Sequence, residues 1–141
     1  MSCSSHVVRT VYPNGRITLE LHCFGECENK VPCEPQWYNP DNSTEILFRT
    51  CFCPDELIQG PCCSHGDGPL GVREQTRALK SCRIALAYQY QKNGIPEAQP
   101  FGVECVGRCG EPGTEGKCKP VTVGSTRFDG ITIEVLKCRC E

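Results

Sequence analysis

The sequence has no long apolar run and no dominant charge of one sign. No stretch approaches the ~18 apolar residues of a membrane-spanning helix, and no apolar segment typical of a signal peptide follows Met1. The net charge is -2, and the 15 basic residues are scattered along the chain. The sequence therefore shows no basic footprint, and we expect neither nucleic acid nor membrane insertion.

Motifs for catalysis are also missing. The chain contains no G-x-S-x-G, H-E-x-x-H or P-loop pattern. His6, His22 and His65 have no nucleophile and acid at a recognisable spacing, so we interpret them as solvated or ordinary strand residues. The sequence predicts a protein that is not an enzyme and that uses no cofactor.

Cysteine is abundant, with 14 in 141 residues. Such a density in a short chain is typical of a disulfide scaffold, which persists in oxidising compartments, so we expect a secreted, extracellular protein. The alternative is a metal-binding protein. Structural zinc sites favour C-x-x-C pairs with histidine partners, whereas the close pairs here are spaced C-x-x-x-C and C-x-C, so we expect disulfides and no metal.

The cysteines form a repeated pattern. Two groups of six flank an adjacent pair, in the order Cys3, Cys23, Cys27, Cys33, Cys51, Cys53; Cys62, Cys63; Cys82, Cys105, Cys109, Cys118, Cys138, Cys140. Both groups contain C-x-G-x-C, centred on Gly25 and Gly107, and both end in C-x-C. The sequence therefore predicts two tandem units, 1–53 and 82–141, joined by a linker at 54–81.

Turn signals divide each unit into two hairpins. Asn-Gly pairs at 14–15 and 93–94 occupy equivalent places between runs of strand-forming residues. A second hairpin turns at 39–43 in the first unit and at Asp-Gly 129–130 in the second. Segment 95–104 carries two prolines and is expected to pair less regularly. The predicted fold class is a small, disulfide-rich, all-β protein with two hairpin fingers per unit.

The spacing of the cysteines favours one arrangement of bridges among many. A unit of about 50 residues is too small to be stable without staples. Six cysteines permit 15 pairings, so their spacing must be used to choose among them. Bridges Cys23–Cys51 and Cys27–Cys53 would close an eight-residue ring through which Cys3–Cys33 could pass. Such a ring favours glycine at its centre, because an inward side chain would fill it.

The order C, C-x-G-x-C, C-x-P, C-x-C resembles the cystine-knot growth factor and hormone superfamily, with knots of the bursicon or glycoprotein-hormone kind. The resemblance implies elongated β units that bind other proteins outside cells. It also implies an equivalent ring in the second unit, closed by the bridges Cys105–Cys138 and Cys109–Cys140, with Cys82–Cys118 as the third bridge. Family members usually carry one knot and dimerise, so two knots in one chain suggest a mimic of that dimer.

Three local features carry further expectations. Cys62 and Cys63 either tether the copies or other chains, giving a disulfide-linked oligomer, or staple the monomer. Asn42 begins the only N-x-S/T match, which is a glycosylation site or an unused sequon. Trp37 and Tyr38 flank a polar hairpin tip and are the candidate protein contacts, whereas the other aromatic residues are expected to cover the thin core.

These patterns lead to three hypotheses about function. The first is a secreted protein-binding module that acts through its hairpin fingers as a hormone-like ligand or an antagonist. The second is a structural protein of an extracellular matrix or adhesive, cross-linked through the linker cysteines. The third is a venom or salivary inhibitor of a host protein. The expected partner is an extracellular protein, whether a receptor, a growth factor or a matrix component.

Overall fold

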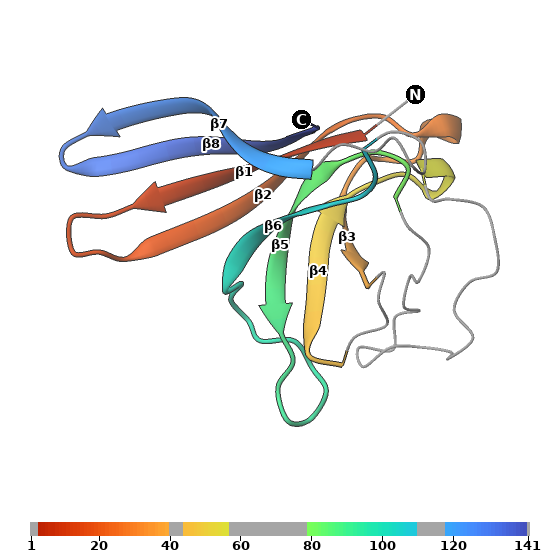
Figure 1. Cartoon of the computed structure of the whole chain (residues 1–141), viewed down its shortest axis with the longest axis horizontal. Helices are drawn as coiled ribbons and strands as arrows, with labels where there is room; N and C mark the ends of the chain where they lie inside the picture. Colours follow the sequence, from red (N-terminus) through yellow and green to blue (C-terminus); the bar gives the residue numbers. More distant parts are fainter. Residues whose placement is uncertain (1–2, 40–43, 57–78, 110–117, 141) are drawn as a thin grey trace.

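A computed structural model describes residues 3–39, 44–56, 79–109 and 118–140, which form two antiparallel four-stranded sheets (Figure 1). The strands are β1 Cys3–Val11, β2 Ile17–Gly25, β3 Pro35–Tyr38, β4 Ile46–Cys51, β5 Arg83–Gln89, β6 Gly102–Val106, β7 Cys118–Phe128 and β8 Ile131–Cys140. Two single 3-10 turns, η1 Glu28–Lys30 and η2 Pro54–Glu56, complete the described elements. The protein is a small, disulfide-rich, all-β fold, as predicted.

No helix among the described residues has the length and apolar character that crossing a membrane requires.

The predicted turns at 14–15, 93–94 and 129–130 are confirmed, and the same chemistry forms the first two; residues 40–43 of the fourth predicted turn lie outside the described residues. The side-chain oxygen of Asn14 accepts a hydrogen bond from the N–H of Arg16 at 2.9 Å, and Asn93 accepts one from Ile95 at 3.1 Å. The glycine that follows each asparagine has a positive φ, 87° at Gly15 and 81° at Gly94. Residues with short polar side chains or none adopt this conformation at least cost, which explains the Asn-Gly pairs.

The predicted irregular arm lies before β6. Of this arm only residues 102–104 belong to a strand, at the start of β6, and a single bridge joins Tyr90 to Pro96 before it. Pro96 and Pro100 have no N–H to donate to a neighbouring strand, which explains the break in the ladder.

Both sheets contain strands from both repeats. We call β1–β4 the first half and β5–β8 the second half. The first sheet has the order β2-β1-β8-β7 and the second sheet has the order β3-β4-β5-β6, so each sheet joins one hairpin of each half (Figure 1). The two halves meet at the pairs β1–β8 and β4–β5, which we call the two seams.

The two seams have the same register. The cysteine landmarks of the repeat make Val7 equivalent to Leu86 and Arg49 equivalent to Leu136. Val7 pairs with Leu136 across the β1–β8 seam, and Leu86 pairs with Arg49 across the β4–β5 seam. Pseudo-equivalent residues therefore pair with each other at both seams, as they would around an internal two-fold axis.

Two apolar clusters lie on opposite faces of the second sheet. The first joins the two sheets and consists of Val7, Ile84, Leu86, Leu136 and Cys138. The second lies on the outer face of the second sheet and consists of Tyr38, Phe52, Leu79, Ala85 and Val106. Leu79 belongs to the predicted linker 54–81 and is fully buried. The described end of the linker is therefore part of the core.

Candidate functional site

The described residues contain six disulfides, three in each half, which join the partners that the sequence and the resemblance suggested. The bridges are Cys3–Cys33, Cys23–Cys51 and Cys27–Cys53 in the first half and Cys82–Cys118, Cys105–Cys138 and Cys109–Cys140 in the second. In each half, two bridges close a ring of eight residues, five from C-x-G-x-C and three from C-x-C.

The glycine at the centre of each ring segment has a left-handed backbone. The φ angle is 109° at Gly25 and 99° at Gly107. A Cβ atom on Gly107 would overlap the carbonyl oxygen of Ser81 and lie 3.3 Å from the Cα atom of Cys82. The chain that leads into the third bridge therefore passes directly against the ring, and only glycine leaves it room.

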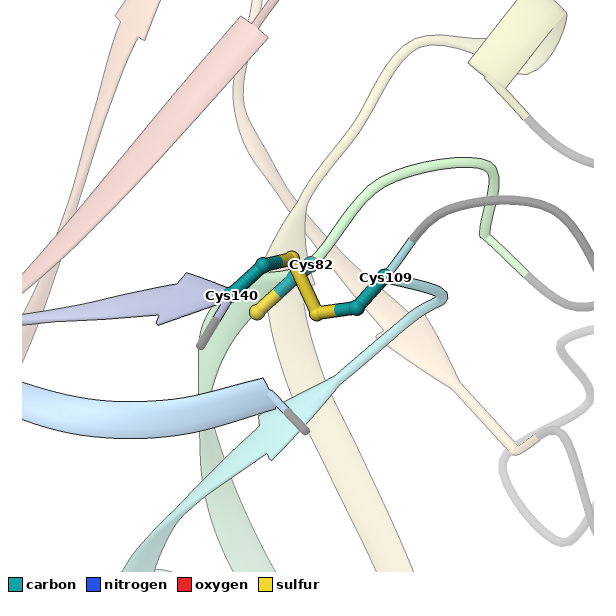
Figure 2. A group of neighbouring side chains, drawn as sticks. All are labelled: Cys82, Cys109 and Cys140. Atoms are coloured by element: carbon teal, nitrogen blue, oxygen red, sulfur yellow. A yellow bond between two sulfur atoms is a disulfide. The ribbon is translucent and has the colours of Figure 1, made fainter. Parts of the chain in front are cut away.

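The third bridge of the second half lies between the two ring bridges. The Sγ atom of Cys82 lies within 4.8 Å of both sulfurs of Cys109–Cys140 (Figure 2), and the Sγ atom of Cys118 lies within 4.8 Å of both sulfurs of Cys105–Cys138. The two ends of one disulfide therefore lie against different ring disulfides.

Equivalent carbonyl groups contact the third bridge in both halves. The Sγ atom of Cys33 lies 3.2 Å from the carbonyl oxygen of Phe24, and that of Cys118 lies 3.7 Å from the carbonyl oxygen of Val106. Phe24 and Val106 both directly precede the central glycine of their ring segment. The third bridge therefore has matching surroundings in the two halves.

None of these sulfur clusters offers a free thiolate to a metal. Three groups of side chains among the described residues have ligand atoms close enough to share an ion. They are Cys82 with Cys109 and Cys140, Cys118 with Cys105 and Cys138, and Cys3 with Cys53 and Glu56. Every cysteine in them is bonded in a disulfide. A cysteine binds a metal as a deprotonated thiolate, which a disulfide does not offer, so these sulfur atoms have a structural role.

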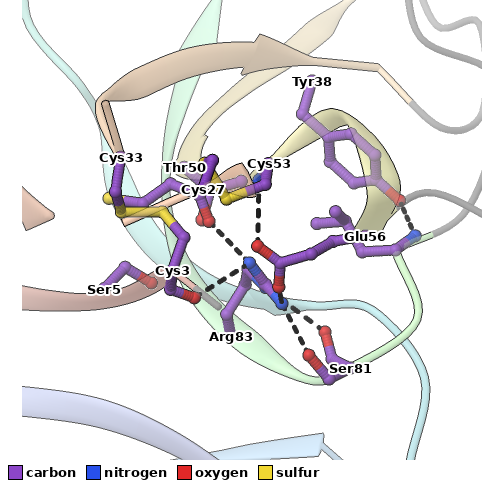
Figure 3. Close-up of polar contacts among 12 residues, drawn as sticks. Cys3, Ser5, Cys27, Cys33, Tyr38, Thr50, Cys53, Glu56, Ser81 and Arg83 are labelled. Atoms are coloured by element: carbon purple, nitrogen blue, oxygen red, sulfur yellow. Dashed lines mark hydrogen bonds and ion pairs between the residues drawn. A yellow bond between two sulfur atoms is a disulfide. The ribbon is translucent and has the colours of Figure 1, made fainter. Parts of the chain in front are cut away.

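A buried ion pair connects the disulfide region of the first half to the second half (Figure 3). Arg83 of β5 is 6% exposed and donates to the carbonyl oxygens of Cys3 at 3.3 Å and Cys51 at 2.8 Å. Its guanidinium also contacts the Glu56 carboxylate at 2.5 Å. The other oxygen of Glu56 accepts the N–H of Cys53 at 2.9 Å. Arg83 is thus connected to the first and last cysteines of the first half. It donates directly to Cys3, and Glu56 links it to Cys53.

The remaining donors of Arg83 are also satisfied. They reach the hydroxyl oxygen of Ser81 at 2.5 Å and its carbonyl oxygen at 3.4 Å. A buried charge is tolerated only when its hydrogen bonds are made, and removing one partner of such a pair is costly. The sequence did not reveal this network, because Glu56 and Ser81 lie in the segment predicted to be linker.

A cavity of about 270 Å³ opens at the β4–β5 seam. Trp37 and Arg49 line it from the first half, and Tyr88 and residues 95–98 line it from the second half. Trp37 and Arg49 are directly opposed on β3 and β4, and Tyr88 extends the same face of the sheet from β5. The cavity therefore exists only because the two halves pair.

The side chains of this cavity pack as a cluster. The guanidinium carbon of Arg49 lies 4.5 Å from the centroid of the Trp37 ring, and the Tyr88 ring meets Trp37 edge-on at 5.1 Å. Burial raises the pKa of Tyr88, while the positive charge of Arg49 acts in the opposite direction. Tryptophan, tyrosine and arginine are the residues enriched among energetic anchors of protein interfaces.

Tyr38 does not have the exposed place expected for a protein contact. It is 1% exposed, its ring meets Phe52 at 5.8 Å, and its hydroxyl oxygen accepts the N–H of Leu79 at 3.0 Å. Neighbouring strand residues point to opposite faces, so Trp37 reaches the cavity while Tyr38 enters the core. Of the two predicted contacts, Trp37 alone lines a surface cavity.

Two aromatic residues that were expected to cover the core lie at the surface instead. Phe128, beside the turn of the β7–β8 hairpin, is 68% exposed, and Phe101 is 52% exposed. The tip of the β7–β8 hairpin extends beyond the reach of the core, which leaves Phe128 in solvent, and Phe101 directly precedes β6. The expectation that the aromatic residues cover the core is wrong at these positions.

Several other predicted positions lie outside the described residues: Asn42, Cys62, Cys63 and His65. His6 and His22 are strand residues that face each other on β1 and β2. The ring of His6 lies 5.1 Å from that of Phe24, and His22 contacts Glu20 at 3.2 Å.

Comparison with family models, with curated proteins and with solved structures finds no match for this chain.

Proposed function

We propose that the protein is secreted and binds another extracellular protein, as a ligand or an antagonist, through the cavity at the β4–β5 seam. The observation that carries this proposal is the cluster of Trp37, Arg49 and Tyr88 around a preformed, mainly apolar hollow. Anchors of this composition dominate the binding energy of protein interfaces.

The size of the cavity favours a protein partner over a small molecule. Sites for small ligands usually measure ~300–1,000 Å³ and enclose most of the ligand. The cavity of about 270 Å³ is at the lower limit of that range and suits one or two side chains of a partner. The half-buried ring of Trp37 would pack against such a side chain.

We also propose that each half is a cystine knot, with the third bridge threaded through the ring. The sulfur contacts at Cys82 and Cys118 support threading, as does the approach of Ser81 to Gly107. Six disulfides in the described residues support an oxidising, extracellular location. Under this proposal the chain is a covalent counterpart of a dimer of one-knot subunits, which the equal registers of the two seams support.

A binding screen tests the function. Biotin-labelled protein is presented to a panel of purified extracellular and cell-surface proteins, and affinities are measured for each binder. Trp37→Ala removes the largest anchor and should weaken binding about 30-fold or more. Arg49→Met should weaken it as well, because the charge over the Trp37 ring is lost.

The matched control is Thr122→Ala. The cysteine landmarks make Thr122 the pseudo-equivalent of Trp37, and it is exposed on β7. This variant should bind the partner with unchanged affinity. A panel without any binder, or a partner that binds the Trp37→Ala variant as tightly as the unmodified protein, would overturn the proposal.

Disulfide mapping and electrophoresis separate this proposal from the cross-linked matrix hypothesis. Under non-reducing conditions a ligand or antagonist of this kind should migrate as one defined species. A ladder of disulfide-linked multimers would favour the structural matrix protein. Peptide mass spectrometry should recover Cys23 linked to Cys51, and a different partner for Cys23 would remove the knot.

A further inference from the structure

The outer face of the second sheet is covered. Its central residues Phe52, Ala85 and Val106 are 7%, 0% and 8% exposed. Tyr38 and Leu79 pack against them in one apolar cluster. Leu79 comes from the segment between the two repeats, so the connection between the halves contributes to this cover.

The pseudo-equivalent face of the first sheet is open. The cysteine landmarks make Phe24 equivalent to Val106, yet Phe24 is 50% exposed. Thr50 is fully buried, whereas its equivalent Lys137 is exposed, and Arg139 is exposed where Phe52 is buried in the other sheet. We call this side of the first sheet the open face.

Positive charge gathers on the open face although the basic residues are scattered in the sequence. Lys119 and Arg139 are directly opposed on β7 and β8. His6 and His22 are opposed on β1 and β2, and Lys137 is close enough to His6 to act on its pKa. Neighbouring strands are ~5 Å apart and alternate residues along a strand ~7 Å apart, so the three cations Lys119, Lys137 and Arg139 lie close together. His6 and His22, which are charged only when protonated, continue the row of Lys137 onto β1 and β2.

The cations of this face have no acidic partner within the described part of the chain. Three ion pairs occur there, and Lys119, Lys137 and Arg139 take part in none of them. Alternation along the strands places one acidic residue, Glu20, on this face, where it contacts His22 at the edge. The face thus presents closely spaced positive charge that is free to meet a ligand.

We propose that the open face binds a sulfated linear polysaccharide. Sulfate groups stay ionised at physiological pH and repeat along an extended chain, which suits exposed cations in rows across neighbouring strands. Phe24 offers an exposed apolar ring beside His6, on the same face as the cations, against which a sugar ring can pack. Lysine is depleted from the cores of protein interfaces, so a face whose cations include two lysines favours a polyanion over a folded protein partner.

The polysaccharide site and the cavity at the β4–β5 seam are on different surfaces. The cavity residues Trp37, Arg49 and Tyr88 face the same side of the second sheet as the cluster between the sheets. The inference therefore goes beyond the proposed protein-binding function, and each can fail without the other. Trp37→Ala should leave polysaccharide binding unchanged.

Binding to immobilised heparin tests the inference. The complete chain should bind at physiological salt, and its affinity should fall steeply as salt rises, as for other ligands of polyanions. The triple variant Lys119→Gln, Lys137→Gln, Arg139→Gln should bind about tenfold more weakly, because three exposed ion pairs are lost.

The matched control is Lys80→Gln, Lys92→Gln, Arg127→Gln. It removes the same charge from exposed positions away from the open face and should bind within about twofold of the unmodified protein. Circular dichroism and non-reducing mass should show both variants folded with intact disulfides. Equal losses in the two variants would mean that binding follows net charge alone and would overturn the site.

Two further probes test the class of ligand. Heparin from which the sulfates have been removed should bind weakly. Poly-glutamate of similar charge should bind more weakly than heparin. No binding to heparin at physiological salt, or equal binding to poly-glutamate with the same loss in the triple variant, would overturn the assignment, the latter in favour of an acidic protein segment.

Discussion

The two seams have one register and different chemistry. At the β4–β5 seam, Trp37, Arg49 and Tyr88 surround a cavity. At the β1–β8 seam, the position equivalent to Tyr88 is Arg9, which pairs with Glu134 at 3.0 Å. Backbone pairing and disulfides thus give the two seams the same backbone arrangement, and the side chains at each seam determine what it can bind.

The two outer faces extend this comparison. On the second sheet Ala85 and Phe52 are buried beneath other residues of the chain, whereas the equivalent positions on the first sheet carry His6 and Arg139. Equal backbones therefore support either a core face or an open charged face. The following predictions test where the equivalence of the halves ends, starting with the largest expected effect.

Substitution of the central ring glycine should destabilise both halves. Gly107→Ala places a Cβ atom against the backbone of Ser81 in a left-handed conformation, and should cost more than about 4 kcal/mol. Gly25 has a similar φ, so Gly25→Ala should be strongly destabilising too. Yield of correctly bridged monomer after oxidative refolding, followed by guanidinium unfolding, measures both.

Gly102→Ala is the control for these two variants. A Cβ atom at Gly102 would meet nothing within 4 Å, so the free energy of unfolding should change by less than about 1 kcal/mol. If Gly107→Ala and Gly102→Ala have similar stability, the close approach of the chain to the ring is not a requirement of the fold.

The buried ion pair should make the two halves respond differently to substitution at equivalent positions. Arg83→Met leaves Glu56 buried without its partner and should lower the free energy of unfolding by about 3 kcal/mol, measured with disulfides intact. The equivalent position in the first half is Ser4, which is exposed, so Ser4→Ala should change stability by less than about 0.5 kcal/mol.

A double variant shows whether the buried charge itself is responsible. Arg83→Met combined with Glu56→Met removes both charges and should recover part of the stability that Arg83→Met loses. A double variant that is less stable than the single variant would mean that packing around Arg83, and not the unpaired carboxylate, accounts for the loss.

The effect of the Arg49 charge in the cavity should be detectable in the pKa of Tyr88. Burial raises the pKa of its hydroxyl group and the charge of Arg49 lowers it. Arg49→Gln removes the lowering effect, so the pKa of Tyr88 should rise further. Resonance-assigned NMR titration follows this residue, and Arg9→Gln at the other seam should leave it unchanged. A fall in the pKa of Tyr88 on Arg49→Gln would contradict the contact.

The smallest expected effect concerns His6. Burial first, and then the charges of Lys137 and His22, lower its pKa below 6.5, while Glu20 lies beyond His22. Its folded form resists protonation, so stability that is present above pH 6.5 should decline slightly as pH falls below that value. His6→Ala should lose this dependence.

A sulfated polysaccharide should act on His6 in the opposite direction. Negative charge on the open face stabilises the protonated ring and should raise the pKa of His6 in an NMR titration. A pKa of His6 that is unchanged at saturating heparin would place the ligand away from β1.

Much of the fold follows from local sequence signals. The Asn-Gly and Asp-Gly turns and the interrupted arm at 95–104 could be expected from the sequence, because turn residues and prolines act locally. The pairing of the twelve described cysteines was suggested by their repeated spacing together with the family resemblance. The spacing of C-x-G-x-C and C-x-C limits which sulfurs can meet. Repetition of the pattern makes the expectation for one half apply to the other.

The seams could not be expected in the same way. Pairing of β1 with β8 and of β4 with β5 joins residues far apart in the chain, and no local signal specifies such partners. The cavity depends on these seams, so Trp37 could be singled out by type while Arg49 and Tyr88 could not. The open face could not be expected because its cations come from β7 and β8 and its histidines from β1 and β2, at opposite ends of the chain.

The pairing of β1 with β8 has a consequence for how the protein is made. A ribosome completes β1 long before β8, so one edge of β1 has no partner during most of synthesis. The three bridges of the first half can form in that interval, but an unpaired strand edge invites pairing with other chains. Newly made protein should therefore depend on chaperones until its last strand arrives.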